Sequence, residues 1–234
     1  MIGSVGGDNH QPNFVGQIQQ LYFNGVYLID LARTGQLPSA NMTAKFGVRE
    51  QSIHHPVNFK SKHTYVGLPQ LKAYSSTNIY FQFKTLEPKG VILFNAGKGQ
   101  DFIAIELVNG HIHYVINLGD GPIRIRDNLR NSLNDNRWHS VTIGRPGARQ
   151  HTLMVDDSIS TVMSQDTKND NLDLNGILYL GGVRKDMYNF LPRQIQSRHG
   201  FEGCLASLDL NGESPDTTLD ALVPSPLVVP GCEG

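Results

Sequence analysis

The sequence predicts an all-β sandwich built from two antiparallel sheets, and two observations support this fold class. Apolar runs of six to eight residues, rich in β-branched and aromatic side chains, recur between residues 78 and 210. Clusters of glycine, asparagine and aspartate separate these runs. Short strands at regular spacing, with turn signals between them and no convincing stretch of helical periodicity, are typical of a β-sandwich.

The predicted strands are, in chain order, 78–85 (NIYFQFKT), 90–96 (GVILFNA), 101–108 (DFIAIELV), 111–118 (HIHYVINL), 137–144 (RWHSVTIG), 151–156 (HTLMVD), 176–182 (GILYLGG) and 204–210 (CLASLDL). Turn signals lie at 109–110 (NG), 119–121 (GDG), 134–136 (NDN) and 155–157 (VDD). Asn109-Gly110 is a strong two-residue turn signal, so 101–118 is expected to form a hairpin. Trp138 is expected to anchor the core, although the alternation around it does not settle which face is buried.

An internal repeat defines the domain organisation. The stretch NFVGQIQQLYFNG at 13–25 aligns with GFEGCLASLDLNG at 200–212, and a Gly-Gly pair precedes each copy. A strand unit that ends the domain therefore also precedes it, which predicts a tandem array of like domains. We divide the chain into a strand unit from the end of a preceding domain (1–31), a polar connector (32–52) and a complete β domain (53–234). Chance resemblance of two glycine-bounded strands is the alternative.

The bulk composition is that of ordinary globular protein. The chain has 234 residues, 39% hydrophobic content and a net charge of -1. The near-zero charge argues against a nucleic-acid partner, which normally selects a basic face. No apolar run reaches transmembrane length, and the first residues lack the basic segment and apolar core of a signal peptide.

The cysteines and one sequon point to the compartment. Cys204 and Cys232 are the only cysteines, and by themselves they are compatible with free thiols, a disulfide or a redox pair without C-x-x-C spacing. Asn41-Met42-Thr43 is an N-glycosylation sequon, which makes Asn41 the candidate glycosylation site. Together these features favour an oxidising, extracellular compartment. Because the two cysteines bracket the final strand and the tail, we expect them to form a disulfide.

Several motifs together resemble one family. NDNRWHSVTIGR, TLMVDD, ILYLGG and GFEGCLASLDLNG…GCEG are similar, in order and spacing, to laminin G-like domains, also called LNS domains. The segment from FGVREQ to YFQFKT and the LNDNRWH motif resemble the fourth LNS domain of α-neurexins, and 13–31 resembles the end of the third. The resemblance implies a jelly-roll, concanavalin-like sandwich. It also implies an extracellular role at the presynaptic cell surface, with the parent protein anchored in the membrane outside these residues.

The resemblance also implies a weak Ca²⁺ site. The matching positions give the side chains of Asp101 and Asp173 and the main-chain carbonyls of Leu118 and Asn171. Ca²⁺ prefers such hard oxygen ligands, and hairpin pairing brings Asp101 and Leu118 to the same end of the sheet. The alternative is that both aspartates are ordinary turn residues, which occur often in such positions.

Other chemistry-bearing residues give weaker signals. Arg124, Arg126 and Arg130 form the one local basic stretch, a candidate partner-binding loop or sulfated-glycan site, with a solvated loop as the alternative. His111 and His113 share a strand face but lack further ligands at zinc spacing. There is no G-x-S-x-G motif, and GKGQ at 97–100 is not a phosphate loop.

We therefore expect a non-enzymatic, extracellular recognition module of a neuronal (synaptic) cell-adhesion protein. The expected partners are extracellular proteins of synaptic adhesion type, bound through a rim of loops around the Ca²⁺ site. A structural spacer in a multidomain ectodomain and a glycan- or heparin-binding domain are the alternatives. A hydrolase on the same sandwich would need a carboxylate pair or triad in a concave face, and the sequence offers no such set.

Overall fold

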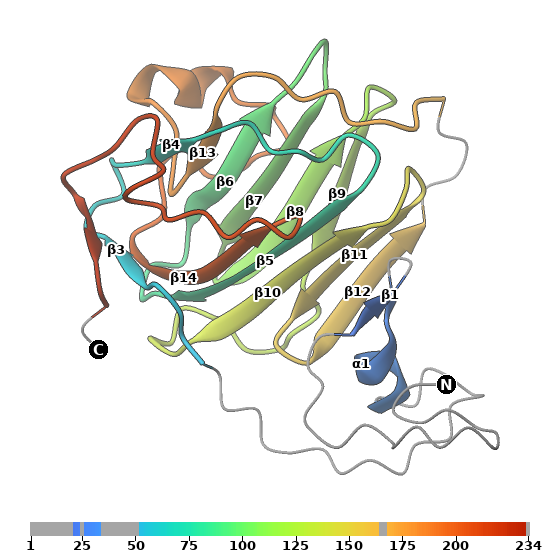
Figure 1. The fold of residues 1–234 in the computed structure, drawn as a ribbon, viewed down its shortest axis with the longest axis horizontal. Helices are drawn as coiled ribbons and strands as arrows, with labels where there is room; N and C mark the ends of the chain where they lie inside the picture. The colour runs from blue at the N-terminus through green and yellow to red at the C-terminus, as the bar shows by residue number, and fades with distance from the viewer. Residues whose placement is uncertain (1–20, 24–25, 34–51, 164–167, 233–234) are drawn as a thin grey trace, which may run out of the picture. The chain divides into compact units, whose positions relative to one another are not determined.

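A computed structural model of the chain describes residues 21–23, 26–33, 52–163 and 168–232. The chain divides into two compact units, Met1–Gly47 and Val48–Gly234. The larger unit is an all-β sandwich of two antiparallel sheets (Figure 1), which is the predicted fold class.

The first sheet has seven strands in the order β12-β11-β10-β5-β14-β3-β15. The second has six strands in the order β4-β13-β6-β7-β8-β9. The strands of the seven-stranded sheet are β3 (Val57–Phe59), β5 (Thr77–Lys84), β10 (His139–Arg145), β11 (Gln150–Val155), β12 (Ser158–Met163), β14 (Gly203–Leu210) and β15 (Val228–Pro230). The strands of the six-stranded sheet are β4 (Val66–Leu68), β6 (Gly90–Ala96), β7 (Phe102–Val108), β8 (His111–Asn117), β9 (Pro122–Arg126) and β13 (Leu178–Leu180).

The main core fills the space between the two sheets. In the seven-stranded sheet, Val141 and Ile143 of β10 pair in register with Phe81 and Ile79 of β5, and all four side chains are buried. In the six-stranded sheet, β7 and β8 contribute alternate residues to the same core cluster. The expectation for Trp138 is wrong: it precedes β10, is only partly buried and lies outside the described core clusters. The smaller Val141 and Ile143 face the core instead.

A second apolar layer covers the outer face of the six-stranded sheet. The segment after β13 forms a short 3-10 helix, η1 (Lys185–Phe190), and places Tyr188, Leu191 and Ile195 against residues of β6, β7 and β8. Glu106 of β7 is fully buried beneath this segment and accepts hydrogen bonds from the main-chain N–H groups of Gln196 and Ser197. These bonds satisfy the buried carboxylate, so strands β6 to β8 are covered on both faces.

The described part of the smaller unit is a hairpin followed by a helix. It contains β1 (Tyr22–Phe23), β2 (Val26–Tyr27) and the short helix α1 (Leu28–Arg33), which the sequence pattern did not predict. Phe23 pairs with Val26 across the Asn-Gly dipeptide. In the C-terminal copy of the repeat, Leu210 pairs with Glu213 across the equivalent Asn-Gly dipeptide. The two copies therefore share this turn register as well as their sequence.

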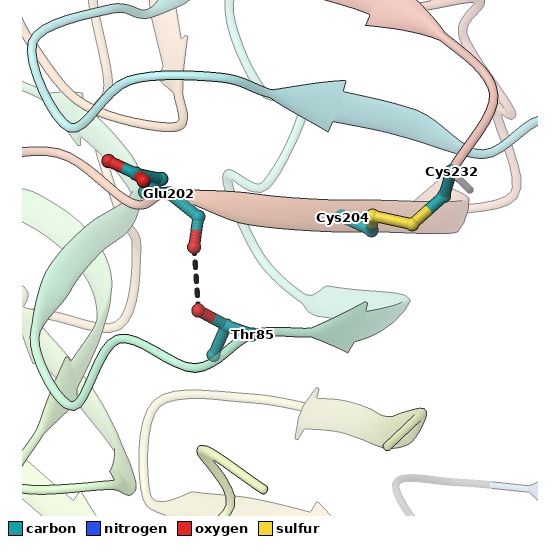
Figure 2. Close-up of a disulfide and its surroundings, with 4 residues drawn as sticks. All are labelled: Thr85, Glu202, Cys204 and Cys232. Carbon is teal, nitrogen blue, oxygen red and sulfur yellow. Dashed lines mark hydrogen bonds between the residues drawn. A yellow bond between two sulfur atoms is a disulfide. The ribbon is translucent and has the colours of Figure 1, made fainter. Parts of the chain in front are cut away.

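A disulfide joins Cys204 of β14 to Cys232 (Figure 2). The two Cα atoms are 6.0 Å apart, and the bridge closes a stretch of 28 residues that includes β15. Beside it, the Thr85 hydroxyl donates a 2.6 Å hydrogen bond to the Glu202 carbonyl. The bridge therefore returns the chain from the edge strand β15 to β14, in the interior of the sheet.

Candidate functional site

The hairpin of β7 and β8 sets the position of two predicted calcium ligands. Phe102 and Asn117 pair in register at the open end of this hairpin. Asp101 directly precedes β7 and Leu118 directly follows β8, so both lie at the same end of the six-stranded sheet. Asn109-Gly110 turns the chain at the other end, where Asn109 has a φ of 51°.

Asp101 also links this end of the sheet to the segment that carries Asp173. The Oδ2 atom of Asp101 accepts a hydrogen bond of 2.8 Å from the Asp173 main-chain N–H. A Cβ atom added at Gly119 would lie 3.3 Å from the Oδ1 atom of Asp101, so that oxygen lies beside the residue that follows Leu118. The structure therefore brings three loops together at Asp101: 97–101, 118–121 and 168–175.

Three further polar residues surround this point, and the sequence did not indicate any of them. The Lys98 ammonium lies 2.9 Å from Oδ2 of Asp173, and this hydrogen bond raises the pKa of the lysine. Asp120 accepts hydrogen bonds from the main chain and side chain of Asn169. Asn169 in turn lies against Gly119, where its Nδ2 atom would be 2.8 Å from an added Cβ. The partners in these contacts are 49 and 75 residues apart in the sequence, so no local sequence pattern predicts them.

The segment that carries Asn171 and Asp173 is held from behind by the loop between β4 and β5. The Leu172 N–H donates to the carbonyl oxygen of Tyr74 at 2.8 Å, and Leu172 itself is buried. The side-chain amide of Gln70 donates to the Leu174 carbonyl, also at 2.8 Å. These bonds fix the main chain on both sides of Asp173. A loop that supplies metal ligands needs a main chain held in place in this way.

The donor set fits a hard divalent cation in part. The carboxylate of Asp101 contacts the main chain of Asp173, and its other oxygen lies beside Gly119, so two acidic residues meet here whose oxygen donors suit Ca²⁺. Within the described ranges, no group of three or more His, Cys, Asp or Glu side chains is arranged to hold a metal ion. A site here would depend on main-chain carbonyls to complete the protein ligands.

The predicted arginine stretch is divided by the structure. Arg124 and Arg126 lie on the edge strand β9, opposite Val115 and His113 of β8, so they share the outer face of the sheet. Arg130 lies beyond the end of β9 and is exposed. His113 is buried, and burial together with the two arginine charges lowers its pKa to about 4.

The neighbouring histidine has a structural partner. His111 Nδ1 lies 2.9 Å from Oδ1 of Asp127, whose other oxygen accepts the Ile112 N–H. The pair therefore links the first residue of β8 to the residue that follows β9. The sequon at Asn41 lies outside the described residues.

Comparison with known proteins defines the class of the domain. A model of the laminin G domain family matches residues 83–213, more than half of the chain. The chain therefore belongs to the laminin G domain family, whose members are non-enzymatic adhesion or receptor modules.

Three similar proteins are neurexins. The chain is 55% identical to neurexin 1 of Drosophila melanogaster in an alignment of 231 positions that covers 95% of this chain and 12% of that protein. It is 48% identical to neurexin-3a of Danio rerio over 94% of the chain and 13% of that protein, and 46% identical to neurexin-2 of Mus musculus over 95% and 13%. These similarities are consistent with an LNS domain of a neurexin and support an extracellular module of neuronal adhesion type. The chain spans about an eighth of these relatives.

Solved laminin structures share the fold. Domains LG4-5 of the mouse laminin alpha1 chain superpose with a TM-score of 0.65 at 24% identity, over 82% of this chain and 49% of that one. The LG1-3 region of the laminin alpha2 chain gives the same TM-score at 20% identity, over 82% and 37%. Among the described residues, no helix has both the length and the apolar character required to cross a membrane.

Proposed function

We propose that the domain is a recognition module of a synaptic cell-adhesion protein, which binds extracellular protein partners through a rim of loops around a weak Ca²⁺ site. The observation that carries the proposal is the meeting of Asp101 and Asp173 at one end of the six-stranded sheet. By resemblance to α-neurexins, residues 53–234 are the fourth LNS domain and residues 1–31 are the end of the third. The connector is 32–52, and the parent protein lies at the presynaptic surface.

The proposed ligands are the carboxylates of Asp101 and Asp173 and the carbonyls of Leu118 and Asn171. Four protein ligands are fewer than the six to eight oxygens that Ca²⁺ takes, so water completes the shell. The bound ion would supply a positive centre at which an oxygen of the partner can replace water. Such a small, low-charge ligand set predicts a dissociation constant of about 0.1–1 mM.

Calorimetric titration with Ca²⁺ tests this site. Asp101→Asn and Asp173→Asn should each weaken Ca²⁺ binding about tenfold or more, because each removes one of two negative ligands. Asp186→Asn is a suitable control, since this exposed aspartate pairs only loosely with Arg184 at 3.5 Å. Equal affinity in the wild type and both site variants would refute the assignment.

Partner binding separates a recognition module from a structural spacer. The full chain, immobilised, should capture ectodomains of synaptic adhesion proteins in Ca²⁺ and release them in chelator. The Asp101→Asn variant should lose this capture at the same Ca²⁺ concentration. Capture that is identical in Ca²⁺ and in chelator would assign recognition to another surface, and no capture in either condition would favour the spacer.

A second candidate function is binding of sulfated glycans. Arg124 and Arg126 lie side by side on one face of the edge strand β9. On the neighbouring strand β8, His113 pairs with Arg126 on one side and with Glu106 of β7 on the other. Burial and the two arginine charges lower the pKa of His113. Paired guanidinium groups suit sulfate oxygens. The test is elution from heparin resin: Arg124→Gln with Arg126→Gln should elute at lower salt than the wild type, whereas Arg137→Gln should not.

A further inference from the structure

The loop between β6 and β7 places a cation of the chain itself beside the proposed calcium ligand. The Nζ atom of Lys98 lies 2.9 Å from Oδ2 of Asp173, and the Lys98 main-chain N–H donates to the Asp173 carbonyl at 2.8 Å. The lysine is therefore held to the same residue by its main chain and by its side chain. Its ammonium group stays near that carboxylate even though the side chain is 70% exposed.

We propose that Lys98 is a built-in competitor of Ca²⁺ at Asp173. The ammonium and the ion require the same carboxylate oxygens, so binding of the ion must displace the lysine or share Asp173 with it. Either event lowers the Ca²⁺ affinity of the site. This inference rests on the calcium site proposed above and adds the residue that sets its strength.

The geometry makes the competition graded. The Asp173 side chain is 44% exposed, and an ion pair in contact with water is weak enough for a divalent cation to break. Ca²⁺ carries twice the charge of the ammonium and can contact Asp101 at the same time. Removal of the lysine charge should therefore tighten Ca²⁺ binding about two- to fivefold, which is the range that an exposed pair supports.

The test is calorimetric titration of the full chain with Ca²⁺ at constant ionic strength. Lys98→Met keeps the length and apolar stem of the side chain and removes the charge. Lys72→Met is the matched control, because Lys72 forms a similarly exposed pair with Glu213 at 2.6 Å. We expect tighter Ca²⁺ binding in Lys98→Met and unchanged binding in Lys72→Met, with thermal midpoints of both variants close to that of the wild type.

A double mutant places the effect at Asp173. In the Asp173→Asn background the lysine has lost its partner, so Lys98→Met should change Ca²⁺ affinity less than it does in the wild type. If Lys98→Met changes the Ca²⁺ affinity equally in both backgrounds, Lys98 acts only through the overall surface charge. That result would refute the proposed competition at Asp173.

The remaining outcomes separate this inference from the calcium site itself. If Asp101→Asn weakens Ca²⁺ binding while Lys98→Met leaves it unchanged, the competition is refuted and the calcium site stands. Equal tightening in Lys98→Met and Lys72→Met also refutes it, because net charge alone would explain the result. If neither the wild type nor Lys98→Met binds Ca²⁺, both the site and the competitor are refuted.

Discussion

At the scale of single residues, Arg145 places a fully buried cation in the described core. It is the last residue of β10 and donates hydrogen bonds to four oxygens. Three are the carbonyls of Ala73, Tyr74 and Ser75 between β4 and β5, and the fourth is the hydroxyl of Thr77, the first residue of β5. Burial lowers the pKa of this guanidinium from its ordinary value. Because the Tyr74 carbonyl also receives the Leu172 N–H, Arg145 orders the loop that supports Asp173.

Replacement of Arg145 should therefore affect both stability and the site. Arg145→Met leaves several buried oxygens without a donor, and we expect it to lower the free energy of unfolding by about 3 kcal/mol. Arg145→Lys should recover only part of this, since a single ammonium cannot span the separated acceptors. Urea unfolding of Arg145→Met and Arg145→Lys measures these losses of stability, with Arg137→Met at an exposed position as control. A loss in Arg145→Met no larger than in the control would contradict this role.

His139 makes stability depend on pH in one direction. Its Nδ1 atom lies 2.8 Å from Asp156 and its Nε2 atom 2.9 Å from Asp135. Burial alone would lower the pKa of His139, but the hydrogen bonds to the two carboxylates outweigh burial and raise it. The protonated form is thus favoured in the fold, so its stabilisation is complete below about pH 6.5 and is lost as pH rises through the raised pKa.

We expect His139→Gln to cost about 1 kcal/mol at pH 5.5 and less at pH 9, because only the imidazolium can donate to both carboxylates. Urea unfolding of the wild type and the variant at both pH values gives the comparison. A cost that does not change between pH 5.5 and pH 9 would show that the ring acts only by packing against Phe83.

His113 acts in the opposite direction. It is buried, and its Nδ1 atom has no hydrogen-bond partner within the described part of the chain. Burial and the charges of Arg124 and Arg126 lower its pKa to about 4, so the fold favours the neutral ring. The stabilisation is present above about pH 6.5 and is lost as pH falls from there toward 4. His113→Gln should therefore lose less stability than the wild type between pH 7 and pH 4.5, as measured by urea midpoints. Parallel curves would contradict the buried neutral ring.

At the scale of elements, alternation and turn chemistry predicted the long strands well. The pattern at 90–96 coincides with β6, and the hairpin at 101–118 is formed by β7 and β8 with one residue removed at each outer end. The three-residue strands β3, β4 and β15 were not predicted, because three residues are too few to show a period of two. β9 begins with Pro122, and β12 mixes polar and apolar residues, none of them buried. Both are edge strands whose formation depends on a neighbour already in place.

The disulfide should matter most for one edge of the seven-stranded sheet. β15 has only three residues, and its pairing with β3 covers Val228 to Pro230. Without the bridge between Cys204 and Cys232, we expect the free energy of unfolding to fall by about 3 kcal/mol, as the chain-entropy model gives for a loop of this size. The double variant Cys204→Ala with Cys232→Ala tests this by hydrogen exchange. Amides of β15 should be accelerated more than those of β7, which respond only to the global loss of stability. Equal acceleration in both strands would mean that the bridge stabilises the fold only globally.

At the scale of the whole molecule, the larger unit contains a complete core of its own. The main core cluster runs from Val57 to Val228, and its described members all lie in this unit. Deletion of residues 1–31 should therefore leave a domain with one cooperative thermal transition. Calorimetry of the truncated and full chains is the measurement. Loss of the cooperative transition in the truncated chain would place the domain boundary earlier in the sequence.

The candidate site was predictable only in part from the chain. Asp101 and Leu118 follow from hairpin pairing, which is local, and Asp173 came from resemblance to a family. Lys98 lies beside Asp173 only because two loops 75 residues apart meet at one end of the sandwich. A glycine-rich loop such as 97–100 shows by itself neither its neighbour nor the charge that it presents there.

The disulfide also determines how the domain carries mechanical load. A pull on the residues after Cys232 does not act on β15 first, because the bridge transmits the tension to Cys204. That residue lies in β14, which has β5 on one side and β3 on the other. The edge strand is by-passed and cannot be peeled away residue by residue. An interior strand must instead be sheared from two neighbours at once, so the bridged domain resists stretching as a unit.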